Sequence, residues 1–240
     1  MLLWGDSFAR ALSPALTEYS RRAGVKVRLL VRPGCHAFFG AVPDNPKVPS
    51  EPDRECRTWL SEVRARLGAD VSRLVGVVLA ARWPVYGRSA QEHGRRPMFD
   101  PGDLEIHEPR IVVARGLGET LDFLEAIGLR ALIVGAPPEF PFRVPGCLWR
   151  SPDRCLVNRS WGAESRAVSR MGIEEALRGH PLADAAEIFD RLCPGLQCSA
   201  GTLAEPLLTD TNHLSPTAAR TLVLPFLSRD LDRLRTPVGR

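Results

Sequence analysis

The amino-acid sequence predicts an α/β fold, a three-layer α/β/α sandwich with a central parallel sheet. Short apolar segments typical of strands alternate with segments of helical periodicity, and no internal repeat is present. The clearest strand, residues 74–81, is a continuous apolar run, which is typical of a parallel strand buried on both faces. The chain of 240 residues is long enough for a single domain with a substantial core, and we expect that domain to span residues 1–240.

The remaining elements follow from the same patterns. Apolar and β-branched runs predict the other strands at 1–4, 25–31, 131–134 and 185–189. Hydrophobic residues at helical spacing predict helices that begin at residue 7, cover 52–67, 109–127 and 163–178, and run from 216 to about 234. Between these elements we expect irregular structure at 32–50, a long polar loop at 87–108 and a proline-rich turn at 137–145.

The first predicted strand ends in Gly5-Asp6-Ser7, where a helix begins. Gly5 permits a sharp turn because it has no Cβ. Ser7 then lies beside the free N–H groups and the positive dipole end of the helix, and such groups can stabilise an oxyanion. In a parallel sheet this position is at the carboxyl ends of the strands, where ligands bind. Ser7 is therefore either a helix-capping serine or a nucleophile with oxyanion donors beside it.

The loop before the last helix offers a general base. A serine hydroxyl needs a base to take its proton, and the base works best when a third group orients it. His213 lies three residues after Asp210, a spacing that can place the carboxylate against one imidazole nitrogen. The alternative is that Asp210 caps the turn and that His213 is a solvated loop residue. The other four histidines lack an aspartate in a comparable strand-end position; they are His36, His93, His107 and His180.

Six cysteines indicate an oxidising compartment. An even number of cysteines without the Cys-x-x-Cys spacing of zinc sites favours disulfide bonds over metal binding. We expect neighbours in the sequence to pair, while other connectivities and buried free thiols stay open as alternatives. The expected pairs are Cys35–Cys56, Cys147–Cys155 and Cys193–Cys198.

Charge and hydropathy exclude several function classes. The net charge of +4, from 32 basic and 28 acidic residues, is too small to indicate a nucleic-acid partner. No apolar run reaches the roughly 18 residues of a transmembrane span, and no group of histidine and acidic residues has a recognised metal-ligand spacing, so we expect no metal and no cofactor. The N-terminus lacks the features of a signal peptide, whereas the cysteines indicate export. We therefore expect a domain cut from a longer, membrane-anchored protein.

Two motifs at opposite ends of the chain resemble those of a known superfamily. Gly5-Asp6-Ser7 and Asp210-Thr211-Asn212-His213 are similar to the first and last motif blocks of the SGNH/GDSL hydrolases, and the order Ser, Asp, His agrees. The Gly-x-Ser-x-Gly elbow of the α/β-hydrolases is absent around Ser7. The resemblance covers essentially the whole chain. It implies a flavodoxin-like three-layer fold in which Ser7, Asp210 and His213 form a catalytic triad.

A narrower resemblance is to the SGNH domain fused to acyltransferase family 3 membrane domains, in bacterial O-acyltransferases that modify surface polysaccharides. It rests on residues 4–7, 79–83 and 210–215, and on the Cys193/Cys198 pair. It implies a periplasmic O-acyltransferase that moves acetyl groups from an acyl donor to a carbohydrate acceptor, with a membrane acyltransferase domain as its partner. The alternatives are a GDSL-type carbohydrate O-acetylesterase and a catalytically silent carbohydrate-binding module.

One departure from the superfamily affects the oxyanion hole. The middle blocks of the superfamily supply a glycine and an asparagine, but here Arg82-Trp83 stands at the place of the asparagine. We expect the oxyanion donors to be the backbone N–H groups of Ser7 and Gly34, together with the Arg82 guanidinium. The alternative for Arg82 is a surface or structural arginine. Trp83 either packs the wall of the cleft or stacks on a sugar ring.

Overall fold

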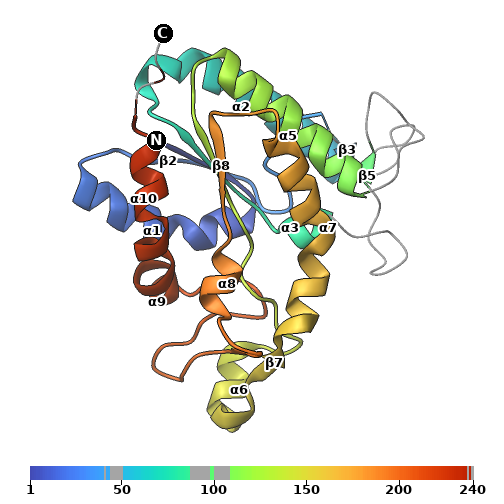
Figure 1. Ribbon diagram of the computed structural model, residues 1–240, viewed down its shortest axis with the longest axis vertical. Helices are drawn as coiled ribbons and strands as arrows, with labels where there is room; N and C mark the ends of the chain where they lie inside the picture. The colour runs from blue at the N-terminus through green and yellow to red at the C-terminus, as the bar shows by residue number, and fades with distance from the viewer. Residues whose placement is uncertain (41, 44–50, 87–97, 100–108, 237, 239–240) are drawn as a thin grey trace.

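A five-stranded parallel sheet forms the centre of the computed structural model, which describes residues 1–40, 42–43, 51–86, 98–99, 109–236 and 238 (Figure 1). The strands are β1 (Leu2–Gly5), β2 (Arg28–Val31), β4 (Val77–Ala80), β6 (Ala131–Val134) and β8 (Ala183–Ala186). Their spatial order is β2-β1-β4-β6-β8, and every neighbouring pair is parallel. This is the strand order of flavodoxin-like doubly wound sheets, and it confirms the predicted fold class.

Burial follows the position of each strand in the sheet. The three central strands β1, β4 and β6 are buried along their whole length, as their continuous apolar sequences predict. The edge strands carry exposed polar residues, among them Arg28 in β2 and Asp184 in β8. The strands predicted at 25–31 and 74–81 are shorter than expected, because only residues 28–31 and 77–80 pair with neighbouring strands.

One face of the sheet packs against the first and last helices. Leu3 and Val78 lie in one hydrophobic cluster with the inner faces of α1 (Ser7–Ala23), α9 (Pro216–Ala218) and α10 (Leu224–Arg233). A π-helical turn at Ala219–Val223 joins α9 to α10. The first and last helices of the chain thus share one layer. The start of α1 and the loop before α9 therefore lie near the same edge of the sheet.

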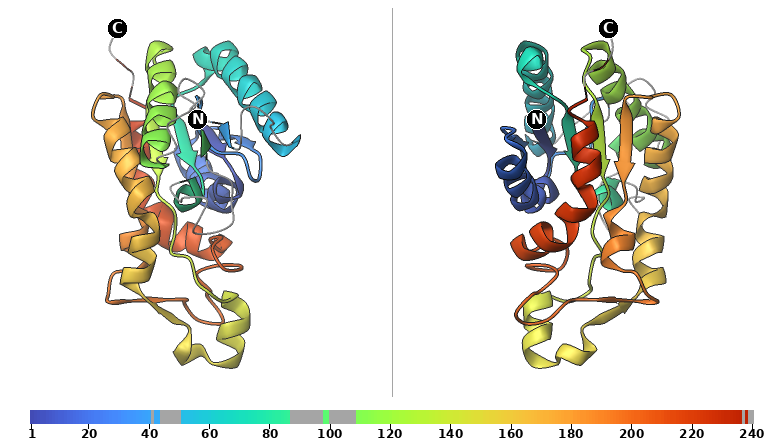
Figure 2. Two further views of the ribbon diagram at one scale, coloured as in Figure 1. Left: turned by 90° about the vertical axis from the view of Figure 1, so that its right-hand side faces the viewer. Right: turned by 60° about the vertical axis from the view of Figure 1, so that its left-hand side comes forward.

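The other face packs against the middle helices. Leu2 and Leu79 lie in a second cluster with α2 (Glu51–Asp70), α5 (Pro109–Ala126) and α7 (Arg159–Leu177). Figure 2 shows the helices of the two layers on either side of the sheet. Within the described ranges, no helix has the length and apolar character needed to cross a membrane.

Two predicted segments need correction, and one short helix was not predicted. The strand predicted at 185–189 ends at Ala186, and Ile188–Leu192 forms helix α8, because its buried side chains recur at helical rather than alternating spacing. The proline-rich turn leads into α6 (Val144–Arg150), whose proline lies in the first turn, where its missing N–H costs nothing. A short helix, α3 (Trp83–Tyr86), directly follows β4.

Smaller elements complete the fold. Two antiparallel pairs lie outside the central sheet: β3 (Val42–Pro43) with β5 (Met98–Phe99), and β7 (Leu156–Asn158) with β9 (Gln197–Ser199). Single turns of 3-10 helix occur at Val71–Arg73 and Pro152–Arg154. The pair β3 and β5 falls within the stretches predicted as irregular, and the rest of the predicted 87–108 loop lies outside the described residues.

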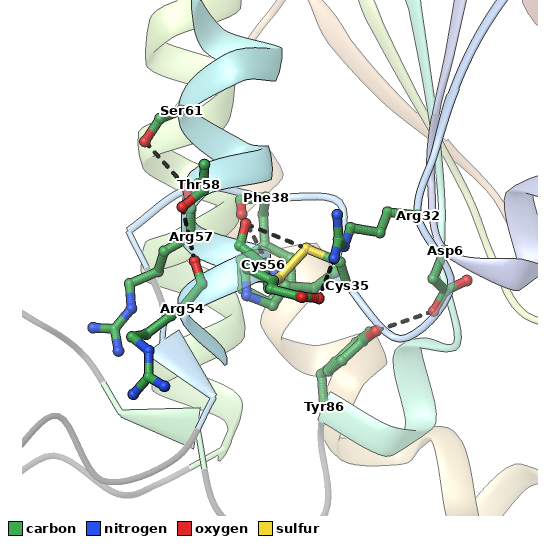
Figure 3. The surroundings of a disulfide bond; sticks show 12 residues. Asp6, Arg32, Cys35, Phe38, Arg54, Cys56, Arg57, Thr58, Ser61 and Tyr86 are labelled. Carbon is green, nitrogen blue, oxygen red and sulfur yellow. Dashed lines mark hydrogen bonds and ion pairs between the residues drawn. A yellow bond between two sulfur atoms is a disulfide. The ribbon is translucent and has the colours of Figure 1, made fainter. Parts of the chain in front are cut away.

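The three predicted disulfide pairs are confirmed. Cys35–Cys56 ties the turn after β2 to α2, as Figure 3 shows. The other two, Cys147–Cys155 and Cys193–Cys198, tie α6 to the start of β7 and the end of α8 to β9. Each bridge therefore anchors a connection that leaves the sheet rather than the sheet itself.

The disulfides close loops of different length, which predicts a ranking of their contributions to stability. The cysteines are separated by 21 residues in the first pair and by 5 in the third. Because a longer loop removes more entropy from the unfolded chain, we expect the Cys35→Ser/Cys56→Ser variant to lose about 3 kcal/mol of unfolding free energy. The Cys193→Ser/Cys198→Ser variant should lose about 2 kcal/mol. Urea unfolding measures both losses, and a reversed order would contradict this ranking.

Candidate active site

The carboxyl ends of two neighbouring strands define the site. Ser7 follows β1 and Arg82 follows β4, and these strands pair directly in the middle of the sheet. In this strand order the chain leaves β1 toward one edge of the sheet and leaves β4 toward the other. Ligands of doubly wound sheets bind at such a reversal point, outside the carboxyl ends of the strands.

Ser7, His213 and Asp210 form a continuous hydrogen-bonded chain. The distance from Ser7 Oγ to His213 Nε2 is 2.8 Å, and that from His213 Nδ1 to Asp210 Oδ2 is 2.7 Å. Both lie within hydrogen-bond reach, so the imidazole can take the hydroxyl proton while the carboxylate orients it. The fold thus brings together the three residues that the sequence predicts as a triad.

The Asp210 carboxylate also orders the loop that carries it. Its Oδ1 accepts hydrogen bonds from the backbone N–H groups of Asn212 and His213, both at 2.9 Å. Partial burial acts to raise the pKa of Asp210, but these N–H groups and the His213 side chain outweigh it and hold the pKa below its usual value. The carboxylate is therefore ionised at neutral pH and can stabilise an imidazolium.

Backbone hydrogen bonds from the segment after β6 hold this loop in place. Phe140 N–H donates to Thr211 O at 2.8 Å, and Val144 N–H donates to Asp210 O at 2.9 Å. The segment after β6 and the loop of His213 are far apart in the sequence. The position of His213 is therefore set by long-range contacts as well as by its own loop.

The turn that carries Ser7 is fixed by a close approach of two strands and by a buried carboxylate. A Cβ on Gly5 would lie 1.7 Å from Ala80 O, so only glycine allows β1 and β4 to come this close. Asp6 Oδ1 accepts the N–H of Phe8 at 2.7 Å and so caps α1. The helix cap is thus Asp6, and the Ser7 hydroxyl is left to bond the imidazole.

The second oxygen of Asp6 joins the segment after β4 to this turn. It accepts a hydrogen bond from Arg82 N–H at 2.9 Å. It also accepts one from the Tyr86 hydroxyl at 3.0 Å, which Figure 3 shows. Burial raises the pKa of Asp6, and hydrogen bonds from Arg82, Phe8 and Tyr86 offset this only in part. Asp6 is a structural carboxylate, distinct from the one that orients His213.

The Arg82 guanidinium pairs with Glu139, a residue that the sequence analysis did not single out. Arg82 Nε donates to Oε1 at 2.8 Å and Nη2 donates to Oε2 at 2.6 Å. The hydrogen bonds to Glu139 raise the pKa of Arg82 against the opposing effect of burial, so the arginine is charged. Glu139 follows the buried strand β6 closely, and a carboxylate at a strand end was the signal that could have found it.

Gly34 lies at the same edge of the sheet, in the turn after β2. Its φ of +79° is in the left-handed region that favours glycine, and the residue is exposed. The turn is closed by a hydrogen bond from Cys35 N–H to Arg32 O and is fastened to α2 by the disulfide to Cys56 (Figure 3). Among the described residues, none accepts a hydrogen bond from the Gly34 N–H.

Trp83 is placed differently from the expected substrate contact. Its side chain is buried, with 1% of the residue exposed, and its indole N–H donates to Val134 O at 2.7 Å. A ring enclosed in this way offers no face to a sugar. The structure therefore corrects the predicted stacking role and supports the packing alternative.

Two other histidines, His36 and His180, are not part of this arrangement. His36 is buried with its Nδ1 2.9 Å from Phe38 O, and His180 Nε2 lies 3.2 Å from Asp122. His93 and His107 lie outside the described residues. In the part of the chain that the structure describes, no group of three or more His, Cys, Asp or Glu side chains is placed to hold a metal ion.

A small apolar cavity lies beside the triad. Its lining includes Phe8 and Leu214, which directly follow Ser7 and His213 in the chain, and Ile188 at the start of α8. Its free volume is about 10 Å³, which is roughly the space of one water-sized group. A cavity of this size has room for one small group, such as a methyl.

Comparison with known proteins agrees with this fold. A family model described as "SGNH domain (fused to AT3 domains)" matches residues 1–228. A comparison with curated protein sequences finds no match.

Among solved structures, the chain is similar to the periplasmic domain of a lipopolysaccharide acetyltransferase from Salmonella ser. Paratyphi A. The identity is 14%, the TM-score is 0.66, and the match covers 96% of this chain and 83% of that one. A GDSL-like lipase from Bacteroides thetaiotaomicron is 10% identical, with a TM-score of 0.48 and coverage of 97% of this chain and 87% of that one. At 14% identity, the likeness to the acetyltransferase domain shows a shared fold only.

The lowered pKa of Asp210 predicts a pH-dependent contribution to stability. A carboxyl group whose pKa is lower in the folded state stabilises the protein above its unfolded pKa, here 3.8, and loses this effect as the pH falls through the folded value. We expect Asp210→Asn to be less stable than the wild type at about pH 6, and the difference to shrink below about pH 4. Urea unfolding over this range measures it. A difference that grows on acidification would contradict an ionised Asp210.

Proposed function

This chain belongs to the SGNH domains that are fused to AT3 domains, and we propose that it transfers an acyl group, acetyl above all, to a hydroxyl of a cell-surface carbohydrate. The general activity that this family supports is acyl transfer or ester hydrolysis. The observation that carries the proposal is the unbroken chain of hydrogen bonds from Ser7 through His213 to Asp210. An arrangement of this kind activates a serine hydroxyl for attack on a carbonyl.

In the proposed reaction, His213 Nε2 takes the proton of Ser7 Oγ while that oxygen attacks the carbonyl carbon of the acyl donor. The carbonyl π electrons move to oxygen, which gives a tetrahedral oxyanion. When this intermediate collapses, His213 returns the proton to the leaving group and Ser7 stays acylated. His213 then takes the proton of a sugar hydroxyl while that oxygen attacks the carbonyl carbon of the acyl-serine. As this second tetrahedral intermediate collapses, the bond to Ser7 Oγ breaks and His213 returns the proton to that oxygen, so that the sugar ester leaves and free Ser7 is restored. Asp210 stabilises the imidazolium in both halves.

Three donors are proposed for the oxyanion. The Ser7 N–H is at the first position of α1, where no intrahelical acceptor exists, and the helix dipole favours negative charge there. The Gly34 N–H belongs to an exposed turn after the neighbouring strand. The Arg82 guanidinium adds a charged donor at the end of β4.

Hydrolysis is the second candidate. The side chains of His213 and Asp210 are 29% and 33% exposed, so water reaches the general base. The two activities differ in the final acceptor. With an aryl acetate as donor and a surface polysaccharide as added acceptor, transfer predicts acetylated polysaccharide, whereas hydrolysis predicts free acetate alone.

The proposal includes a partner and a location. The family model describes domains fused to AT3 domains, so we infer a membrane acyltransferase domain as the source of the acyl group. Three disulfides fit an oxidising compartment, and we place the domain at the periplasmic face of a bacterial membrane.

Alanine at Ser7 or at His213 should lower kcat for hydrolysis of an aryl acetate by several orders of magnitude, because either change removes the nucleophile or its base. Ser13→Ala and His180→Ala are matched controls, since both side chains bond elsewhere, and each should keep kcat within about twofold. Steady-state kinetics of the purified domain measures all four variants. Retention of most of the activity in Ser7→Ala would refute the proposed nucleophile.

The small cavity predicts a preference for short acyl groups. We expect kcat/KM to be higher for an aryl acetate than for the butyrate, because the cavity has little room beyond a methyl group. Ile188→Ala should raise the butyrate-to-acetate ratio of kcat/KM by about tenfold, as expected for a pocket enlarged by a few carbons. Ile173→Ala, which truncates a buried side chain in the other hydrophobic cluster, should leave the ratio unchanged. If the butyrate-to-acetate ratio of kcat/KM is the same in both variants, the acyl group does not bind in this cavity.

A further inference from the structure

A second group of charged and polar side chains lies at the same edge of the sheet as the triad. We call Asp6, Arg82, Tyr86 and Glu139 the Arg82 cluster. Glu139 binds the Arg82 side chain, Asp6 accepts the Arg82 backbone N–H, and Tyr86 donates to Asp6. Only 24% of the Arg82 side chain and 10% of the Glu139 side chain are exposed. Removing two charges from water costs free energy that their pairing does not always repay, so such a pair is weak evidence for a stabilising role. Its place next to the nucleophile turn calls for a functional explanation.

The pairing with Glu139 leaves part of the Arg82 guanidinium available. A guanidinium carries five N–H groups, and Glu139 accepts one from Nε and one from Nη2. These two nitrogens form one side of the planar group, so Nη1 is directed away from the carboxylate. No residue in the described ranges accepts a hydrogen bond from Nη1.

Both partners of the pair are fixed relative to the reacting groups. The Arg82 N–H donates to Asp6, the residue that precedes the nucleophile, at 2.9 Å. Phe140, the residue after Glu139, donates its N–H to Thr211 O in the loop of the general base at 2.8 Å. The guanidinium is therefore held between the segment of the nucleophile and the segment of the base.

We propose that Glu139 is a positioning residue that orients the Arg82 guanidinium, so that Nη1 donates to the oxyanion formed when Ser7 attacks an acyl ester. This inference rests on the proposed acyl-transfer function. Negative charge on that oxygen develops only as the carbonyl is attacked, so a donor fixed in advance raises kcat more than it lowers KM. Without Glu139 the flexible arginine side chain would have to be ordered during the reaction, at a cost in rate.

Variants of the pair test the positioning role through the kinetic parameters. In the Arg82→Ala variant and in the isosteric Glu139→Gln variant, we expect kcat for an aryl acetate to fall by about a hundredfold or more, with KM within about threefold of wild type. Arg82→Lys, which keeps the charge but cannot form the two-nitrogen pair, should lose kcat to a similar degree. Arg64→Ala is a matched control, because Arg64 also pairs with a carboxylate: its Nη1 lies 2.8 Å from Glu119 Oε1, on helices α2 and α5. This variant should keep the wild-type kcat.

Added guanidinium ion supplies a readout that a structural ion pair would not move. At concentrations far below those that unfold proteins, it should restore about tenfold or more of the lost kcat in Arg82→Ala, because Glu139 remains to orient it. The Arg82→Ala/Glu139→Ala variant should show no such rescue. Because rescue is measured within a folded variant, loss of stability cannot imitate it.

The outcomes separate this inference from the function on which it rests. If Arg82→Ala and Glu139→Gln both keep kcat, or if guanidinium rescues the single and double variants equally, Glu139 does not position Arg82. If a fluorophosphonate still labels Ser7 of the wild type in that case, the proposal that Ser7 is the nucleophile stands, and only the inference about Glu139 is overturned. An unlabelled, inactive wild type would overturn both the function and the inference.

Discussion

The Asp6 carboxylate accepts three hydrogen bonds that join the start of α1 to the segment after β4. Burial of this group is costly, as its raised pKa indicates, and the donors from Phe8, Arg82 and Tyr86 offset part of that cost. Because Asp6 caps the helix, Ser7 is free to bond His213. Because the second oxygen holds the Arg82 backbone, the guanidinium is anchored beside the nucleophile turn. One buried carboxylate thus links the proposed nucleophile with its proposed oxyanion donor.

The sequence was informative wherever the signal is local or chemically distinctive. The apolar run at β4 identified a central strand from its own residues alone. Ser7, Asp210 and His213 could be paired across the chain because strand ends in a parallel sheet meet at one edge. In the structure His213 lies 2.8 Å from Ser7 on one side of its ring and 2.7 Å from Asp210 on the other. The cysteine pairs followed from neighbour order.

The sequence failed where the outcome depends on partners far along the chain. Ile188–Leu192 is helical, but a pattern of only five residues directly after a strand cannot distinguish a short helix from a continuation of that strand. Trp83 is buried because α3 turns its ring toward β6, a packing that no local pattern encodes. Glu139 could be recognised as a candidate only from the fold, which places it against Arg82, 57 residues away.

The central claim is that Ser7 is a nucleophile activated by His213. The most direct test is to treat the folded domain with a serine-directed fluorophosphonate and to locate the adduct by peptide mass spectrometry. We expect one phosphonyl group on Ser7 in the wild type, none in Ser7→Ala, and much slower labelling in His213→Ala, because the base is missing. A folded wild-type domain that stays unlabelled, or that is labelled at another serine, would contradict the account.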